Sequence, residues 1–253
     1  MEAINSPFYD PYRVIPFRGY KSAAQPLGDH CVSLMHFIES EKYRGIDDCY
    51  RQYRLTLTDH EDFTLETIGV GQAVKRHDWE EVKGAMFRAG FWMQLFQRVD
   101  EMRPYLLQPN CQTGIPLLDG AAWDVYQRLT ESTTPGNELR RVVIAGDVEA
   151  NPTGLLEQLN QLFSVRLPDE VVVTTESGVA DLVHDYCLSK YLPVRCISVG
   201  DSRLDLAVDQ ALNKATHVFV FSQNEASTSK FAEDLLDAAT AAGKISHRIA
   251  RVE

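Results

Sequence analysis

The sequence lacks several features that would assign it to a familiar class of protein. It has five cysteines but no CxxC pair, which disfavours a disulfide framework or a zinc ribbon and favours a reducing cytosol. No run of about 18 apolar residues occurs, so we expect no membrane span. The first residues lack the basic start and apolar core of a signal peptide. We therefore expect a cytoplasmic protein with no membrane partner.

Short catalytic motifs are absent as well. There is no HExxH or other spaced metal pair, no GxSxG, no P-loop and no kinase motif. The segment GVGQAV, residues 69–74, half-matches a dinucleotide fingerprint, but it lacks the third glycine and follows no clear strand. We therefore expect neither a bound metal nor a resident cofactor.

The charge of the chain restricts its partners. The formal net charge is −11, and neither half of the chain is a basic module. Nonspecific binding of duplex nucleic acid needs several phosphates to be neutralised, so this charge disfavours it. A local basic site for one small anion stays compatible with the sequence, and so does a homo-oligomer or a protein partner.

A domain boundary is predicted at ESTTPGNE, residues 131–138, which clusters Ser, Thr, Pro, Gly and Asn between two periodic regions. We therefore expect domains at residues 1–132 and 139–253. After the boundary, strands are expected at 141–145, 170–174, 193–199, 217–222 and 245–252. Helices are expected between them at 155–164, 180–191, 204–214 and 229–242. This alternation predicts an α/β fold with a doubly wound, mainly parallel, Rossmann-like sheet, and the continuous Val/Ile runs suit strands buried on both faces.

The first half of the chain is predicted to be mostly helical, with a little irregular or strand structure. Apolar spacing indicates helices over residues 34–43, 62–74 and 78–99. Asp78 is placed to cap the last of these, and Phe91 and Trp92 within it are expected in the core.

The helix SLMHFIESEKY, residues 33–43, poses a functional question. Its apolar residues share one stripe, and the opposite face carries His36, Glu39, Ser40 and Tyr43. That face is either catalytic or the solvated side of a half-buried helix, and the spacing alone favours the solvated side.

Three loops should meet at the carboxyl edge of the predicted sheet, where doubly wound folds bind ligands. Their chemistry is carried by Gly146 and Asp147 in the first, by Gly178, Ala180 and Asp181 in the second, and by Thr228 and Ser229 in the third. These segments resemble the SLOG-type Rossmann-like superfamily, which includes the LOG phosphoribohydrolases and the DNA-processing protein A group. The resemblance covers residues 140–253 and implies ligand binding at these positions.

The chain departs from that family at its phosphate-binding positions. Asp147 and Glu149 stand where an anion would sit, and Thr174 and Thr175 replace two glycines. The resemblance therefore implies a weakened phosphate site, and a sheet that serves only as a scaffold stays open.

The first half resembles the NADAR family, named for NAD and ADP-ribose, over residues 8–130. The matching segments are Phe17–Tyr20, the helix with His36, Ser40 and Lys42, and the helix that opens at Trp79. Where the family has a Trp-Gly pair near its C-terminal end, this chain has only Ala121–Asp124 around Trp123. Members of that family cleave N-glycosidic bonds. The resemblance implies ligand contacts at Phe17, Lys42 and Trp123, and a catalytic role for His36.

The principal acid of that family is missing, because Met35 stands at its position and a thioether accepts no proton at neutral pH. Glu39 lies one turn further along the helix and is the candidate for a displaced acid. We therefore expect a protein that binds a nucleotide or ADP-ribose-type ligand with catalysis weakened or lost. The alternatives are an active N-glycosidase and a non-enzymatic assembly protein.

Overall fold

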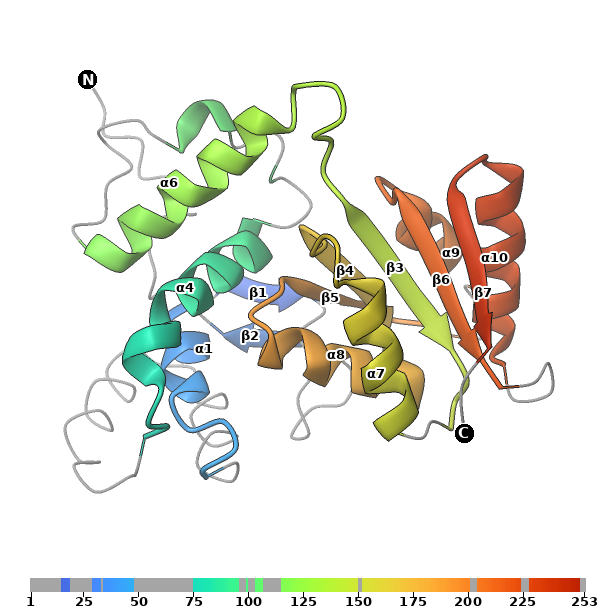
Figure 1. Ribbon diagram of the computed structural model, residues 1–253, viewed down its shortest axis with the longest axis horizontal. Coiled ribbons are helices and arrows are strands. Elements are labelled where there is room, and N and C mark those ends of the chain that lie inside the picture. The colour runs from blue at the N-terminus through green and yellow to red at the C-terminus, as the bar shows by residue number, and fades with distance from the viewer. Residues whose placement is uncertain are drawn as a thin grey trace. The chain divides into compact units, whose positions relative to one another are not determined.

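The computed structural model describes residues 15–18, 29–32, 34–47, 75–95, 99, 103–106, 115–149, 152–200, 204–223 and 228–250. The chain divides into two compact units (Figure 1). Apart from Arg18, the N-terminal unit contains the described residues up to Glu138, and the C-terminal unit begins at Leu139. This division comes at the end of the polar segment 131–138.

The C-terminal unit is built on a parallel sheet. Its strands are β3 (Arg141–Gly146), β4 (Glu170–Thr174), β5 (Val194–Ile197), β6 (His217–Ser222) and β7 (Ile245–Ala250). They lie in the order β5-β4-β3-β6-β7, and every neighbouring pair is parallel. The prediction of an α/β fold with a mainly parallel, Rossmann-like sheet is therefore confirmed.

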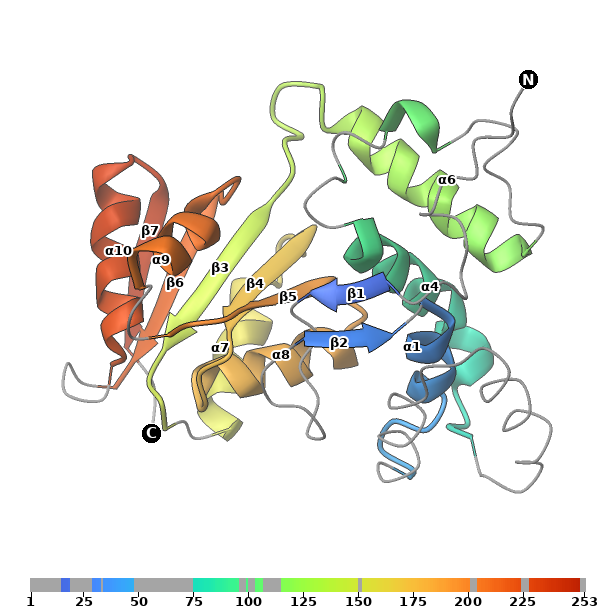
Figure 2. The ribbon, with the colours of Figure 1, turned by 180° about the vertical axis from the view of Figure 1, so that it is seen from behind.

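Helices cover both faces of this sheet. They are α7 (Pro152–Leu162), α8 (Val179–Ser189), α9 (Leu204–Leu212) and α10 (Lys230–Ala241). Figures 1 and 2 show α7 and α8 on one face and α9 and α10 on the other. Each lies where the sequence predicted a helix, with bounds that differ by a few residues at most.

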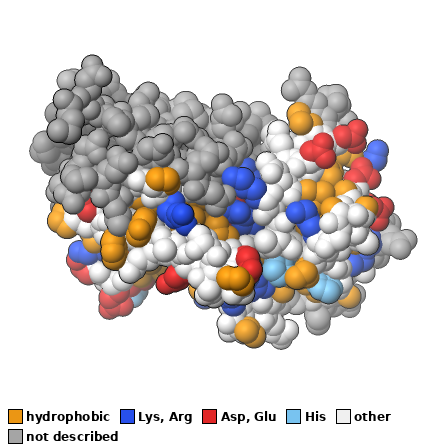
Figure 3. All heavy atoms as spheres, turned by 90° about the horizontal axis from the view of Figure 1, so that it is seen from above, with side chains coloured by type: hydrophobic (Ala, Val, Ile, Leu, Met, Phe, Trp, Pro, Cys, Tyr) orange, Lys and Arg blue, Asp and Glu red, His pale blue; other side chains and the backbone are white. Residues whose placement is uncertain are grey.

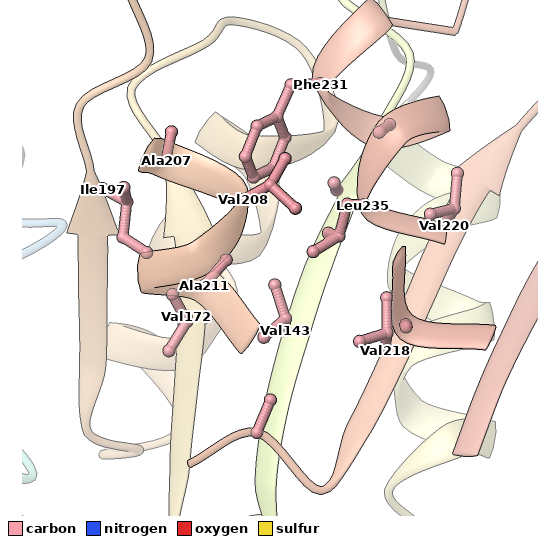
Figure 4. Packing of buried hydrophobic residues seen from close by; sticks show 14 residues of the cluster. Val143, Val172, Ile197, Ala207, Val208, Ala211, Val218, Val220, Phe231 and Leu235 are labelled. Atoms are coloured by element: carbon pink, nitrogen blue, oxygen red, sulfur yellow. The ribbon is translucent and has the colours of Figure 1, made fainter. Parts of the chain in front are cut away.

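Small side chains let α9 and α10 pack closely on the sheet. Their core positions include Ala207, Ala211, Ala232 and Ala239, which meet valines such as Val143 and Val220 from the strands. Figure 4 shows Val208, Phe231 and Leu235 filling the space between the two helices and the sheet. The valine runs of β3 and β6 are buried, as expected for parallel strands covered on both faces.

The described part of the N-terminal unit is mostly helical. It contains β1 (Ile15–Arg18) and β2 (Asp29–Val32) in one small sheet, with α1 (Leu34–Glu41), α4 (Trp79–Leu95), the 3-10 turn η2 (Arg103–Tyr105) and α6 (Pro116–Glu131). The long helix α4 packs against both α1 and α6. The helix predicted at 62–74 lies outside the described residues.

The largest fully buried side chains in the described part of this unit are aromatic. Phe91 and Trp92 are fully buried in α4, as predicted. All three tryptophans of the chain, Trp79, Trp92 and Trp123, belong to this unit. None of the described helices combines the length and apolarity needed to cross a membrane.

Candidate functional site

The carboxyl ends of β3, β4 and β6 form the candidate site of the C-terminal unit. The chain moves from β3 outward through β4 to β5, and then returns to the other side of β3 to form β6. The boundary between β3 and β6 is therefore the point where the strand order reverses, and doubly wound sheets bind ligands there. The three loops singled out in the sequence begin at this edge.

Asp147 connects these loops to one another. Its carboxylate is fully buried and accepts a hydrogen bond from the backbone N–H of Gln223 at 2.8 Å and another from the Thr228 hydroxyl at 3.4 Å. Its backbone N–H donates to the carbonyl of Phe221, and its own carbonyl accepts from the N–H of Val179. Asp147 thus stabilises the joint between the ends of β3 and β6 and the start of α8.

Two of the predicted glycines allow this close approach. A Cβ on Gly146 would lie 2.1 Å from the carbonyl oxygen of Phe221. Gly178 has φ +77°, and a Cβ there would lie 2.4 Å from the carbonyl oxygen of Asp147. Both contacts are far shorter than van der Waals distance, so packing of backbone on backbone is sufficient to explain why glycine stands at each position.

Glu176 follows β4 at the same edge and was not singled out from the sequence. Its Oε2 accepts hydrogen bonds from the hydroxyls of Thr174 at 3.0 Å and Ser229 at 3.2 Å. Burial raises the pKa of the Glu176 carboxyl above its ordinary value, although these two hydrogen bonds act in the opposite direction. Glu176 is therefore a half-buried carboxyl held in a fixed orientation.

Hydroxyl side chains complete the site. The hydroxyls of Ser222 and Thr228 lie 2.6 Å apart. Ser229 caps α10 by accepting from the N–H of Ala232, so one side chain both begins a helix and orients Glu176. The structure thus brings together Gly146, Asp147, Gly178, Thr228 and Ser229, while Asp181 lies nearby in the first turn of α8.

The described residues of the three loops carry acids but no bases. Residues 146–149, 175–178, 222–223 and 228–229 include Asp147, Glu149 and Glu176, and they contain neither Lys nor Arg. Negative charge at this edge opposes phosphate and favours groups that donate hydrogen bonds, such as sugar hydroxyls.

In the N-terminal unit, the prediction that the polar face of α1 is solvated was wrong. Ser40 and Tyr43 are buried, and the side chain of Glu39 is only 13% exposed. Local partners allow this burial, since the Ser40 hydroxyl donates to the carbonyl of Phe37 at 2.7 Å and Arg44 donates to the fully buried Glu41 at 2.8 Å.

The structure brings together two of the residues predicted from the NADAR resemblance. Glu39 forms an ion pair with Lys42, whose ammonium lies 5.6 Å from the centre of the Trp79 ring. Phe17 and His36 belong to β1 and α1, and their side chains lie outside the described residues. Trp123 is 46% exposed on α6, and its ring stacks on that of Tyr126.

Sequence reasoning also missed Gln94 in α4. Both polar atoms of its side-chain amide are buried, and neither has a hydrogen-bond partner in the structure. No motif in the sequence marks this position, because an unpaired amide becomes visible only once the neighbouring side chains are in place.

We compared the chain with models of protein families, with curated proteins and with solved structures, and no match was found. The NADAR and SLOG resemblances therefore stay predictions. Among the described residues, no group of three or more His, Cys, Asp and Glu side chains is placed to hold a metal ion.

Proposed function

We propose that this protein binds a nucleotide or ADP-ribose-type ligand at the carboxyl edge of the C-terminal sheet and holds it by the hydroxyls of its ribose. The observation that carries the proposal is the position of Glu176, a half-buried carboxylate at the end of β4 that is oriented by Thr174 and Ser229. In dinucleotide-binding sheets, an acidic side chain beyond the first turn accepts a hydrogen bond from the ribose in the same way.

The acidic character of this edge supports recognition of the sugar rather than the phosphate. Asp147 and Glu149 occupy the first turn, where related folds use backbone N–H groups to bind phosphate. A phosphate would be repelled there, whereas a ribose hydroxyl donates to a carboxylate in a charge-assisted hydrogen bond. The ribose end of the ligand is thus expected beside Glu176, with its phosphates directed away from Asp147.

Loss of catalysis is part of the same proposal. The family acid is replaced by Met35, and the carboxylate of Glu39 is engaged by Lys42. The N-glycosidase alternative requires Glu39 to leave this ion pair and serve as the acid. The assembly alternative requires no ligand at all.

Titration calorimetry with adenosine, AMP, ADP-ribose and NAD tests the proposal. We expect adenosine to bind at least as tightly as AMP, because the sugar provides the contacts and the phosphate is repelled. Glu176→Gln should weaken binding about tenfold, since the hydrogen bond from ribose would lose its charged acceptor. The matched control is Glu157→Gln on the exposed side of α7, which should leave the affinity unchanged.

Mass analysis of the recovered ligand separates binding from hydrolysis. We expect ADP-ribose and NAD to be recovered intact from the wild-type protein. Cleavage that disappears in Glu39→Gln would instead establish the N-glycosidase. No heat with any of the four compounds would exclude the proposed ligand class and favour assembly.

A further inference from the structure

Strand β7 ends the sheet of the C-terminal unit with an open edge. It pairs with β6 in a continuous register from Ile245 to Ala250. No strand in the described part of the chain pairs with its outer side. The strand contains no proline, glycine or bulge that would hinder further pairing, so N–H and C=O groups on its outer side form a template for another strand. One backbone group of β7 is already engaged, since the carbonyl of Ala250 accepts a hydrogen bond from the Gln158 side chain at 2.6 Å.

One face of β7 offers apolar side chains to such a strand. Every second residue of the strand lies on this face, namely Ile245, His247 and Ile249, and Ile245 is 52% exposed. In the register, His247 is the partner of Phe219 in β6, and the two rings stack with centres 5.9 Å apart. The face therefore combines aliphatic side chains with an imidazole whose ring stacks on the neighbouring Phe219.

The charge of this edge is opposite to that of the whole chain. Residues 244–250 include Lys244, His247 and Arg248 but no acid, although the chain carries a net charge of −11. Arg248 reaches back to Glu233 of α10, with its Nη2 2.7 Å from the carboxylate. The described segment of β7 is thus basic on an acidic protein, with Arg248 paired with Glu233 and the Lys244 ammonium donating to the carbonyl of Ala215 at 2.7 Å.

Further cations lie beside the start of β7. Burial, followed by the positive charges of Arg140, His247 and Arg166, lowers the pKa of His217 in β6. One acid lies among them, since the carboxylate of Asp169 accepts the backbone N–H of Arg140 at 2.8 Å. Figure 3 looks onto the amino ends of the strands and shows histidine side chains beside hydrophobic and basic ones.

We propose that β7 accepts an extended acidic segment of a partner protein as an additional strand of the sheet. Main-chain hydrogen bonds to β7 would provide affinity. Acidic side chains opposite His247 and Arg248, and aliphatic ones opposite Ile245 and Ile249, would provide specificity. This inference goes beyond the proposed ligand site, which lies at the carboxyl ends of the strands.

Charge makes a second copy of the chain a poor occupant. Pairing two β7 strands around a two-fold axis matches each face with itself. The two longest such registers place either His247 opposite His247 or Arg248 opposite Arg248. In the second register the two guanidinium groups would repel each other, and in the first two imidazoles face each other, so neither register gains the opposite-charge pairs that an acidic strand would form.

A synthetic peptide provides the test. The capped sequence Thr-Val-Glu-Glu-Thr-Val, run antiparallel to β7, places its valines opposite Ile249 and Ile245 and its glutamates opposite Arg248 and His247. Fluorescence anisotropy of the labelled peptide with the full chain should show saturable binding that weakens as salt is added. Hydrogen exchange should show new protection of amides within 245–250. The control peptide replaces both glutamates with lysine and should not bind.

Two acidic substitutions locate the contact. Arg248→Glu and His247→Glu should each weaken peptide binding at least tenfold, and His247→Glu does so without removing the pair between Arg248 and Glu233. Lys190→Glu makes the same change in charge as Arg248→Glu at the exposed C-cap of α8, and it should alter the affinity less than twofold.

Three outcomes would overturn the proposal: equal binding of the lysine peptide, exchange protection outside β7, or no binding of the acidic peptide at low salt. Gel filtration tests whether a second copy of the chain binds to this edge instead. A dimer of the wild-type chain that Arg248→Glu abolishes would assign this edge to a second copy and would also refute the proposal.

Discussion

The carboxylate of Asp147 at the end of β3 accepts the backbone N–H of Gln223, which follows β6, at a distance of 2.8 Å. This contact joins two strands that are neighbours in the sheet but far apart in the sequence. Because Asp147 is fully buried, its removal should lower the free energy of unfolding of the C-terminal unit.

We expect Asp147→Ala to lower the free energy of unfolding by about 2 kcal/mol, because the N–H of Gln223 and the hydroxyl of Thr228 each lose a charged acceptor. Asp147→Asn keeps one acceptor oxygen and should lose about half as much. Urea unfolding followed by circular dichroism measures both. Asp209→Ala, at an exposed position of α9, is the control and should stay within about 0.5 kcal/mol of the wild type.

Gly178→Ala should destabilise the protein by at least about 2 kcal/mol, because alanine is strained at φ +77° and its Cβ would collide with the backbone of Asp147 and Val148. The same measurement on Gly120→Ala should show a gain of about 0.5–1 kcal/mol, since Gly120 lies inside α6 with open space around it. Equal effects of the two substitutions would contradict the backbone contact at Gly178.

Glu176→Gln should change how stability depends on pH. The raised pKa of Glu176 means that the folded protein holds this proton more tightly than the unfolded chain, in which the carboxyl titrates near 4.5. The stability that this proton contributes is therefore present below pH 4.5 and is lost as the pH rises through the folded pKa. Glutamine does not titrate, so the variant should gain stability relative to the wild type as the pH is raised from about 4 to about 7.

The matched measurement for Glu176 is a series of urea titrations across this range of pH, with Glu157→Gln as the exposed control. A difference between variant and wild type that stays constant with pH would show that burial does not perturb this carboxyl.

Gln94→Met should stabilise the protein by about 1 kcal/mol, because it replaces an unpaired buried amide by an apolar side chain of similar length. Gln127→Met, at an exposed position of α6, should have an effect within about 0.5 kcal/mol. A marked loss of stability in Gln94→Met would mean that the amide is satisfied in solution, for example by a water molecule.

The strands and helices of the C-terminal unit were predictable because their signals are local. Runs such as Val171–Val173 can be read without knowing their neighbours, and each is buried as expected. The ends of the elements were less accurate. Helix α7 begins at Pro152 rather than at the first apolar residue of its stripe, because proline suits the first turn of a helix.

The polar contacts of the candidate site were not predictable in the same way. Glu176 is oriented by Ser229, which lies 53 residues further along the chain, and no local pattern indicates that pairing. The burial of Ser40 and Glu41 was missed because apolar periodicity does not reveal that polar groups can satisfy each other within one helix. Sequence patterns placed the loops, but tertiary structure determines which of their side chains meet.

The confinement of all three tryptophans to the N-terminal unit gives the protein a built-in optical label. Its intrinsic tryptophan emission reports on that unit alone, because the C-terminal unit contains no indole. Far-ultraviolet dichroism instead samples the backbone of both units. Recording the two signals in one denaturation experiment therefore assigns each unfolding step to a unit without any dye or truncation.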